Sequence, residues 1–121
     1  MKFQVYYKKP CPGSDTVRCY CCGFDPNPGL TIADVVGDPR PGFPHFALVR
    51  EIDVQSIDRV FLMMQGEVWS PNGEARELIK SLGLWHTSMS VGDVAIDENG
   101  NGWQCDYLGW IPLAKSREVA A

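Results

Sequence analysis

The chain has 121 residues, of which 45% are hydrophobic and 21% are charged, and its formal net charge is −4. This composition is typical of one globular domain and excludes a fully disordered chain. The acidic balance argues against general nucleic-acid binding, because phosphates are bound by clustered lysine and arginine side chains.

The N-terminal third is expected to hold one strand and then an irregular insert. The β-formers between Phe3 and Lys8 predict the strand. Most of the prolines lie in residues 10–44, and proline neither fits inside a helix nor donates to a strand ladder. We therefore predict a long Pro/Cys-rich loop there, in which residues 29–36 form a turn of helix or a brief strand.

A second strand and a helix are predicted next. Residues 45–52 have the apolar and polar alternation of a strand. Asp53 or Ser56 can cap the helix that follows, and Gly66 interrupts or ends it. The apolar stripe of this helix has the spacing of a buried face and consists of Ile57, Val60, Phe61 and Met64.

Another helix is expected to begin within residues 70–72, where Ser, Pro and Asn suit the first positions of a helix. Gly83 followed by Leu84 predicts a Schellman stop at its end. Its buried stripe is expected to consist of Ala75, Leu78, Ile79 and Leu82.

Two further strands are predicted, over residues 88–96 and 103–113, with Gly109 as a bulge or kink in the second. Residues 97–102 form the turn between them, in which Asn99-Gly100 supplies the positive φ angles of a tight hairpin. The fold class predicted is α+β, a small, mainly antiparallel sheet with two helices packed on it and a long Pro/Cys-rich loop.

The domain organisation follows from these elements. Residues 1–113 are expected to form a single α+β domain, with residues 10–44 as an irregular insert and residues 45–113 as its core. Residues 114–121 are expected to be a flexible tail, because little in them can be buried.

One motif in the C-terminal half resembles a known group of proteins. The segment Ser88–Val94 reads SMSVGDV, and it is followed by Trp103, Cys105, Gly109 and Trp110. This pattern resembles small hypothetical proteins carried by phages and plasmids, loosely akin to the YodL-like group. The resemblance implies an α+β domain and a mobile-element origin, and it brings no catalytic residues with it.

The state of the cysteines follows from the compartment that the sequence predicts. No apolar run reaches the roughly 18 residues of a membrane span, and the first residues lack the apolar core of a signal peptide. We therefore expect a cytoplasmic protein with no membrane partner, in which cysteines are free thiols or metal ligands. No cofactor is expected, with zinc as the alternative. Its ligands would come from Cys11, Cys19, Cys21 and Cys22, completed by His45 or Cys105.

A second set of polar residues lies near the end of the second helix. His86 precedes Ser88 and Ser90, and a histidine next to serines suggests a base and a nucleophile. Such a pair needs an oriented third group, and no nucleophile elbow or oxyanion glycine cluster is present, so the preferred interpretation is a joint residue that hydrogen-bonds to backbone. Asp93 is interpreted in the same way, as a turn residue that binds its own backbone.

The functional hypothesis preferred from the sequence is a non-enzymatic binding protein of a phage or plasmid. Its partner would be a host or phage protein, and inhibition of a host defence system is one such role, in which an acidic decoy occupies a basic site. Trp69 and Trp85 bracket the second helix, so either could be core or exposed to a partner.

Two alternatives stay open. The first is a small-ligand or nucleotide-binding domain with a pocket between the second helix and the next strand. The second is a zinc-dependent or hydrolytic enzyme. The residues expected to bind a ligand or partner are Trp69, Asn72, Arg76, Trp85, His86, Ser88 and Ser90.

Overall fold

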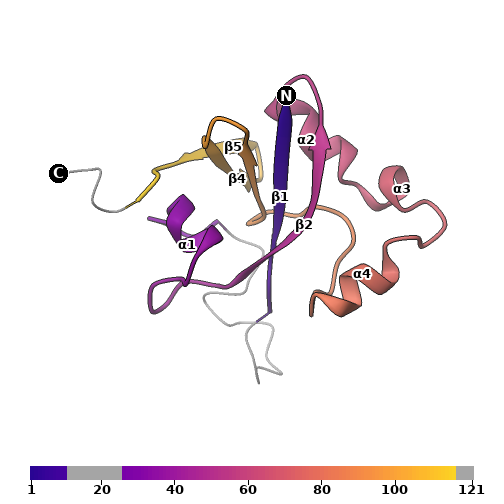
Figure 1. Cartoon of the computed structure of the whole chain (residues 1–121), viewed down its shortest axis with the longest axis horizontal. Helices are drawn as coiled ribbons and strands as arrows, with labels where there is room; N and C mark the ends of the chain where they lie inside the picture. The colour runs from indigo at the N-terminus through magenta and orange to yellow at the C-terminus, as the bar shows by residue number, and fades with distance from the viewer. Residues whose placement is uncertain (11–25, 117–121) are drawn as a thin grey trace.

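The computed structural model describes residues 1–10 and 26–116 and shows a five-stranded antiparallel sheet with helices on both faces (Figure 1). The predicted α+β class is confirmed. The strand order is β2-β1-β3-β4-β5. The strands are β1 (Lys2–Lys8), β2 (Phe46–Asp53), β3 (Val94–Asp97), β4 (Gly102–Asp106) and β5 (Gly109–Leu113). The helices are α1 (Ile32–Val36), α2 (Ile57–Met63), α3 (Gly66–Trp69) and α4 (Arg76–Ser81).

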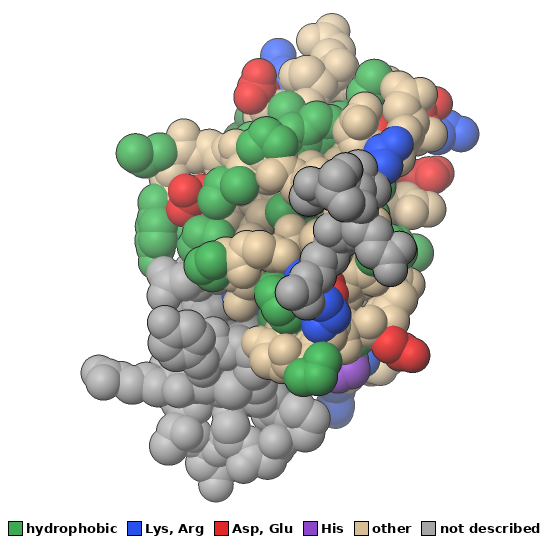
Figure 2. All heavy atoms as spheres, turned by 90° about the vertical axis from the view of Figure 1, so that its left-hand side faces the viewer, with side chains coloured by type: hydrophobic (Ala, Val, Ile, Leu, Met, Phe, Trp, Pro, Cys, Tyr) green, Lys and Arg blue, Asp and Glu red, His purple; other side chains and the backbone are tan. Residues whose placement is uncertain are grey.

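The first strand of the chain is interior to the sheet. β1 pairs with β2 on one side and with β3 on the other, and its pairing with β2 shifts register between Val5 and Tyr6. The edge strands are β2 and β5, and β5 carries Pro112, which has no N–H to offer to another strand. On the side of the molecule where α1 and β5 lie, hydrophobic side chains reach the surface among scattered charged ones (Figure 2).

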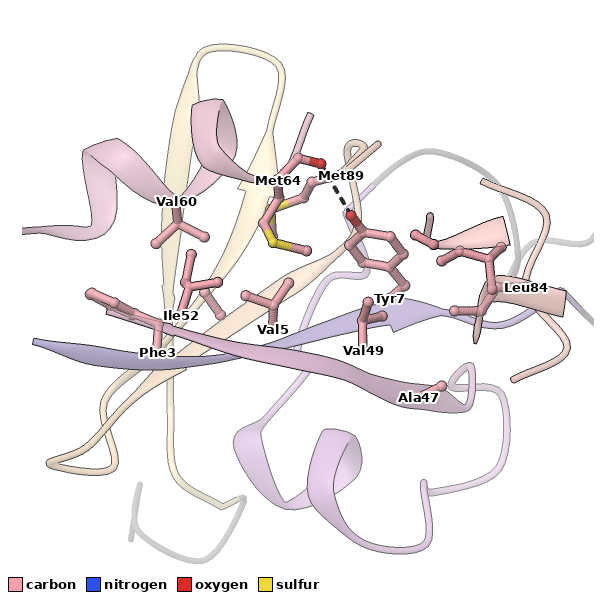
Figure 3. Packing of buried hydrophobic residues seen from close by; sticks show 13 residues of the cluster. Phe3, Val5, Tyr7, Ala47, Val49, Ile52, Val60, Met64, Leu84 and Met89 are labelled. Carbon is pink, nitrogen blue, oxygen red and sulfur yellow. Dashed lines mark hydrogen bonds between the residues drawn. The ribbon is translucent and has the colours of Figure 1, made fainter. Parts of the chain in front are cut away.

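The main core lies between the sheet and the layer formed by α2, α3 and α4. β1 supplies Phe3, Val5 and Tyr7, which alternate along the strand and are fully buried. Val60 and Met64 point down onto them from α2 and the residue after it (Figure 3). The other buried members of this core are Ala47, Val49, Ile52, Ala75, Ile79, Leu84, Met89 and Ala95.

The opposite face of the sheet is covered by α1 and its flanking segments. Between the two alternatives for residues 29–36, the structure shows the helix. Thr31 and Asp34 form a capping box at its start, which satisfies N–H groups that a helix end leaves unpaired. The second core is small and consists of Leu30, Val35, Val94 and Ile96.

Both predicted helical stripes were partly wrong. Phe61 is 41% exposed, and Leu78 is also exposed. The reason is helix length: α2 has 7 residues and α4 has 6, so each buries a narrow face rather than a stripe of four. Gly66 does not simply end α2, because it begins the short helix α3.

The second predicted helix begins later than expected. Ser70 Oγ accepts a hydrogen bond of 2.8 Å from the N–H of Ala75, and the turn between them has Gly73 at a φ of +84°. This turn occupies the residues where the helix was expected to start. The predicted Schellman stop is present: the N–H of Leu84 donates to the carbonyl oxygen of Ile79 at 3.0 Å, and Gly83 has a φ of +72°.

The strands after α4 also differ from the prediction. β3 begins at Val94 rather than at residue 88, and residues 103–113 form two strands of a second hairpin instead of one kinked strand. In the turn between β3 and β4, only Gly100 has a positive φ, +82°. Asp97 Oδ1 closes this turn by accepting from the N–H groups of Asn99 and Asn101.

The start of the predicted tail is attached to α1. The carbonyl oxygens of Ala114 and Lys115 accept hydrogen bonds of 2.9 and 3.1 Å from the N–H groups of Ile32 and Ala33. Residues 117–121, the rest of the predicted tail, lie outside the described residues.

Candidate functional site

A buried carboxylate organises the loop between α4 and β3. Asp93 is 1% exposed. Its Oδ1 accepts from the backbone N–H of Lys8 at 2.8 Å, and its Oδ2 accepts from the N–H of Ser90 at 2.8 Å and lies 2.9 Å from His86 Nε2. The expected bond to its own turn is present, but the carboxylate also joins the end of β1 and the His86 ring to this loop.

The His86 ring is held by stacking as well. It lies on the ring of Tyr7 with centroids 4.7 Å apart and planes inclined by 14°. Tyr7 Oη donates to the carbonyl oxygen of Thr87 at 2.7 Å, and Trp69 Nε1 donates to the same oxygen at 3.1 Å. Burial raises the pKa of the Tyr7 hydroxyl, and the nearby Asp93 adds to this effect. These contacts fix the loop to the sheet and to α3.

The ionisation of Asp93 is governed by opposing effects. Burial raises the pKa of its carboxyl, while the hydrogen bond and charge of His86 and the N–H groups of Lys8 and Ser90 lower it. The net direction is upward.

The hydroxyl groups of Ser88 and Ser90 are hydrogen-bonded to backbone groups. Ser88 Oγ accepts a 2.7 Å hydrogen bond from the N–H of Gly66, and Ser90 Oγ donates to the carbonyl oxygen of Ser88 at 3.2 Å. A nucleophilic serine needs its hydroxyl hydrogen-bonded to the base. Ser90 uses its hydrogen for backbone, whereas Ser88 is bonded here only as an acceptor, and the hydrogen bond of His86 described above goes to the Asp93 carboxylate.

Trp69 and Asn72 are each held by contacts of their own. Trp69 is half-buried against the main core, and the guanidinium of Arg50 lies 5.1 Å from the centre of its ring. Asn72 bonds to Glu74 within the turn before α4, with Nδ2 3.1 Å from Oε1. Trp69 therefore belongs to the support of the loop, and Asn72 to a turn.

A separate pocket lies at the end of α4. It has a volume of about 420 Å³ and includes Arg76 and Trp85 from the predicted set. Trp85 is 76% exposed, whereas Leu84 beside it is buried and forms part of the pocket floor. The other lining residues are Ile79, Lys80, Gly83 and Thr87.

The charge of this pocket is positive. Arg76 and Lys80 are four residues apart on α4, so their side chains share one face of the helix. Within residues 1–10 and 26–116, neither has a carboxylate at ion-pair distance. Sequence reasoning overlooked Lys80 and Thr87. The i, i+4 spacing from Arg76 was a signal that could have found Lys80.

The predicted zinc ligands can be placed only in part. Cys11, Cys19, Cys21 and Cys22 lie outside the described residues. Cys105 is buried in β4, and burial raises the pKa of its thiol to about 11. In the part of the chain that the structure describes, no three His, Cys, Asp or Glu side chains are grouped so as to hold a metal ion.

Comparison with known proteins gives no relative for this arrangement. No family model, curated protein or solved structure matches the chain. In the described residues, none of the helices has the length and apolar character needed to cross a bilayer.

Proposed function

We propose that this chain is a non-catalytic binding domain that contacts an acidic segment of a partner protein through the corner formed by α4 and Trp85. The observation that carries the proposal is the exposure of Trp85 beside Arg76 and Lys80 in one open pocket. Tryptophan and arginine are the side chains most enriched among binding hot spots. An indole left 76% in water loses the burial that normally stabilises it, so its placement favours a contact made in a complex.

The charges of the corner define the chemistry of the partner. The chain as a whole carries a net charge of −4, yet Arg76 and Lys80 face the pocket without acidic partners in the described residues. Carboxylates of a partner can accept from the Arg76 guanidinium in a two-pronged contact while an apolar group covers Trp85. That the partner belongs to a host defence system of a phage- or plasmid-bearing cell is a further part of this proposal, drawn from the resemblance of Ser88–Val94 and the residues after it to phage and plasmid proteins.

The test is capture of partners from host lysate with matched baits. The site variants are Trp85→Ala and the double reversal Arg76→Glu/Lys80→Glu. The control, Arg59→Glu/Lys115→Glu, makes the same change in net charge at two exposed positions elsewhere. We expect a partner that the wild type and the control retain and that both site variants bind at least about 30-fold more weakly, the effect of a 2 kcal/mol hot spot. A partner retained equally by all four baits would place the contact elsewhere and contradict the proposal.

A second candidate uses the same pocket for a nucleotide. Its volume of about 420 Å³ falls in the range of small-ligand sites, with Trp85 as a stacking surface and Arg76 and Lys80 as phosphate ligands. Titration with ATP, followed by the amide resonances of α4, distinguishes the candidates. Saturable shifts that Trp85→Ala abolishes would favour the nucleotide over the acidic protein segment.

A further inference from the structure

A second pocket, of about 260 Å³, lies between α2 and the hairpin of β4 and β5. Three aromatic side chains line it: Phe61 from α2, Tyr107 from the hairpin turn and Trp110 from β5. Tyr107 is 69% exposed, and Leu108 beside it at the tip of the hairpin is 100% exposed. Hydrophobic side chains are also visible across the upper part of the neighbouring face in Figure 2.

Two carboxylates lie at the same pocket. Asp58 comes from α2 and Asp106 from the end of β4. Asp106 is held in place because its Oδ1 accepts a 2.8 Å hydrogen bond from the N–H of Tyr107. In residues 1–10 and 26–116, no basic group lies at ion-pair distance from either carboxylate.

Aromatic faces together with carboxylates that have no basic partner in the described residues select one class of ligand. A cation above an aromatic ring is attracted by the negative face of the ring, and carboxylates add charge-assisted hydrogen bonds. An anion would be repelled by Asp58 and Asp106, and a purely apolar group would leave their negative charges uncompensated. The volume, below that of most small-ligand sites, suits a single side-chain head group.

We infer that this pocket receives one lysine or arginine side chain of a protein partner, with an apolar neighbour of that residue covering Leu108. The positive head group lies against Phe61, Tyr107 and Trp110 and bonds to the carboxylates of Asp58 and Asp106. This pocket binds a cationic group, whereas the α4 corner binds an anionic one, so the inference goes beyond the proposed function and does not depend on it.

The test is a nuclear magnetic resonance titration of the full chain with three acetylated and amidated pentapeptides, GLKLG, GLRLG and GLQLG. We expect the lysine and arginine peptides to shift the Tyr107 amide and the Trp110 indole N–H, and to bind at least about 10-fold more tightly than the uncharged glutamine peptide. Equal binding of all three peptides would show a merely apolar site and overturn the inference. So would the absence of lysine- or arginine-dependent shifts at millimolar peptide.

Variants separate this pocket from the rest of the molecule. Tyr107→Ala and Asp58→Asn/Asp106→Asn are each expected to weaken the lysine peptide about 10-fold, while Trp85→Ala leaves its binding unchanged. The amide spectrum of each free variant reports whether it is folded. Should the double variant not fold, Asp58→Asn alone tests the same pocket at an exposed position. A dimer seen by sedimentation that competes with the peptide would mean that a second copy occupies this surface, and would also overturn the inference.

Discussion

Asp93 Oδ2 and His86 Nε2 lie 2.9 Å apart in the loop between α4 and β3, with the carboxylate buried and the imidazole ring stacked on Tyr7. The pair holds together segments that are distant in sequence, because the same carboxylate accepts from the N–H of Lys8, 85 residues earlier. Its consequences should therefore be seen in stability.

The first prediction concerns the pH dependence of that stability in Asp93→Asn. Because burial raises the pKa of Asp93 above its ordinary value of 3.8, the native state holds this proton more tightly than the unfolded chain. The free energy of unfolding of the wild type, relative to Asp93→Asn, is thus expected to be highest below pH 3.8. It declines as the pH rises through the raised pKa. Urea titrations of both proteins between pH 3.5 and 7.5 measure the difference in their free energies of unfolding. An advantage of the wild type that grows with pH would contradict the prediction.

The second prediction has the opposite sign and concerns Asp34→Asn. The hydrogen bonds of Arg40 and Thr31 hold the pKa of Asp34 well below its ordinary 3.8, with Arg40 Nη2 at 2.7 Å and Nε at 2.9 Å from the carboxylate. The stabilisation is present above pH 3.8 and is lost as the pH falls toward the lowered pKa. We expect Asp34→Asn to cost about 2 kcal/mol at pH 7 and progressively less below pH 4. The exposed Asp38→Asn is the control, and an equal loss in both variants would refute the role of Asp34.

Local patterns in the sequence predicted the elements that local interactions determine. The β-formers between Phe3 and Lys8 gave β1, and Gly83 followed by Leu84 gave the end of α4, because strand propensity and a helix stop each depend on neighbours in sequence. For residues 29–36, the sequence analysis did not decide between a turn of helix, which is α1, and a brief strand. The capping box of α1, Thr31 with Asp34, was a local signal within four consecutive residues.

The elements that were predicted wrongly depend on distant contacts. Residues 88–93 looked like the start of a strand, but Asp93 turns inward to the backbone of β1, and no local pattern shows that. Phe61 fitted the stripe of a longer helix, and only the position of the β4–β5 hairpin shows that it lines a surface pocket instead.

The candidate site could be predicted only in part from the sequence, for the same reason. Trp69 and Trp85 looked alike in sequence, on either side of one helix. The Schellman stop buries Leu84 and leaves Trp85 in solvent, whereas Trp69 Nε1 is turned to the carbonyl oxygens of Met64 and Thr87. Which tryptophan is exposed was thus decided by the tertiary contacts of the loop.

The third prediction tests the packing of α1 on the sheet. A Cβ placed on Gly102 would lie 2.8 Å from Ile32 Cγ1 and 3.0 Å from its Cδ1, which is closer than atoms in contact can approach. We expect Gly102→Ala to lower the free energy of unfolding by about 1–3 kcal/mol, the usual effect of overpacking. In Gly102→Ala/Ile32→Ala the clash is removed, so the glycine substitution should cost little in the Ile32→Ala background. A double-mutant cycle by urea unfolding measures the coupling, and additive effects would contradict this contact.

The fourth prediction concerns the thiol of Cys105. Its pKa is raised to about 11 by burial and by the charges of Asp93 and Asp106, so about one molecule in a thousand carries the thiolate at pH 8. Its backbone N–H is bonded to the carbonyl oxygen of Asp93 at 2.8 Å, which ties this part of β4 to the residue before β3. Iodoacetamide should therefore alkylate Cys105 in the native protein at least about 100-fold more slowly than in 8 M urea, as peptide mapping by mass spectrometry would show. Glutathione in the same mixture reports the activity of the reagent. Equal native and denatured rates would mean that the thiol is accessible and that β4 is not packed as observed.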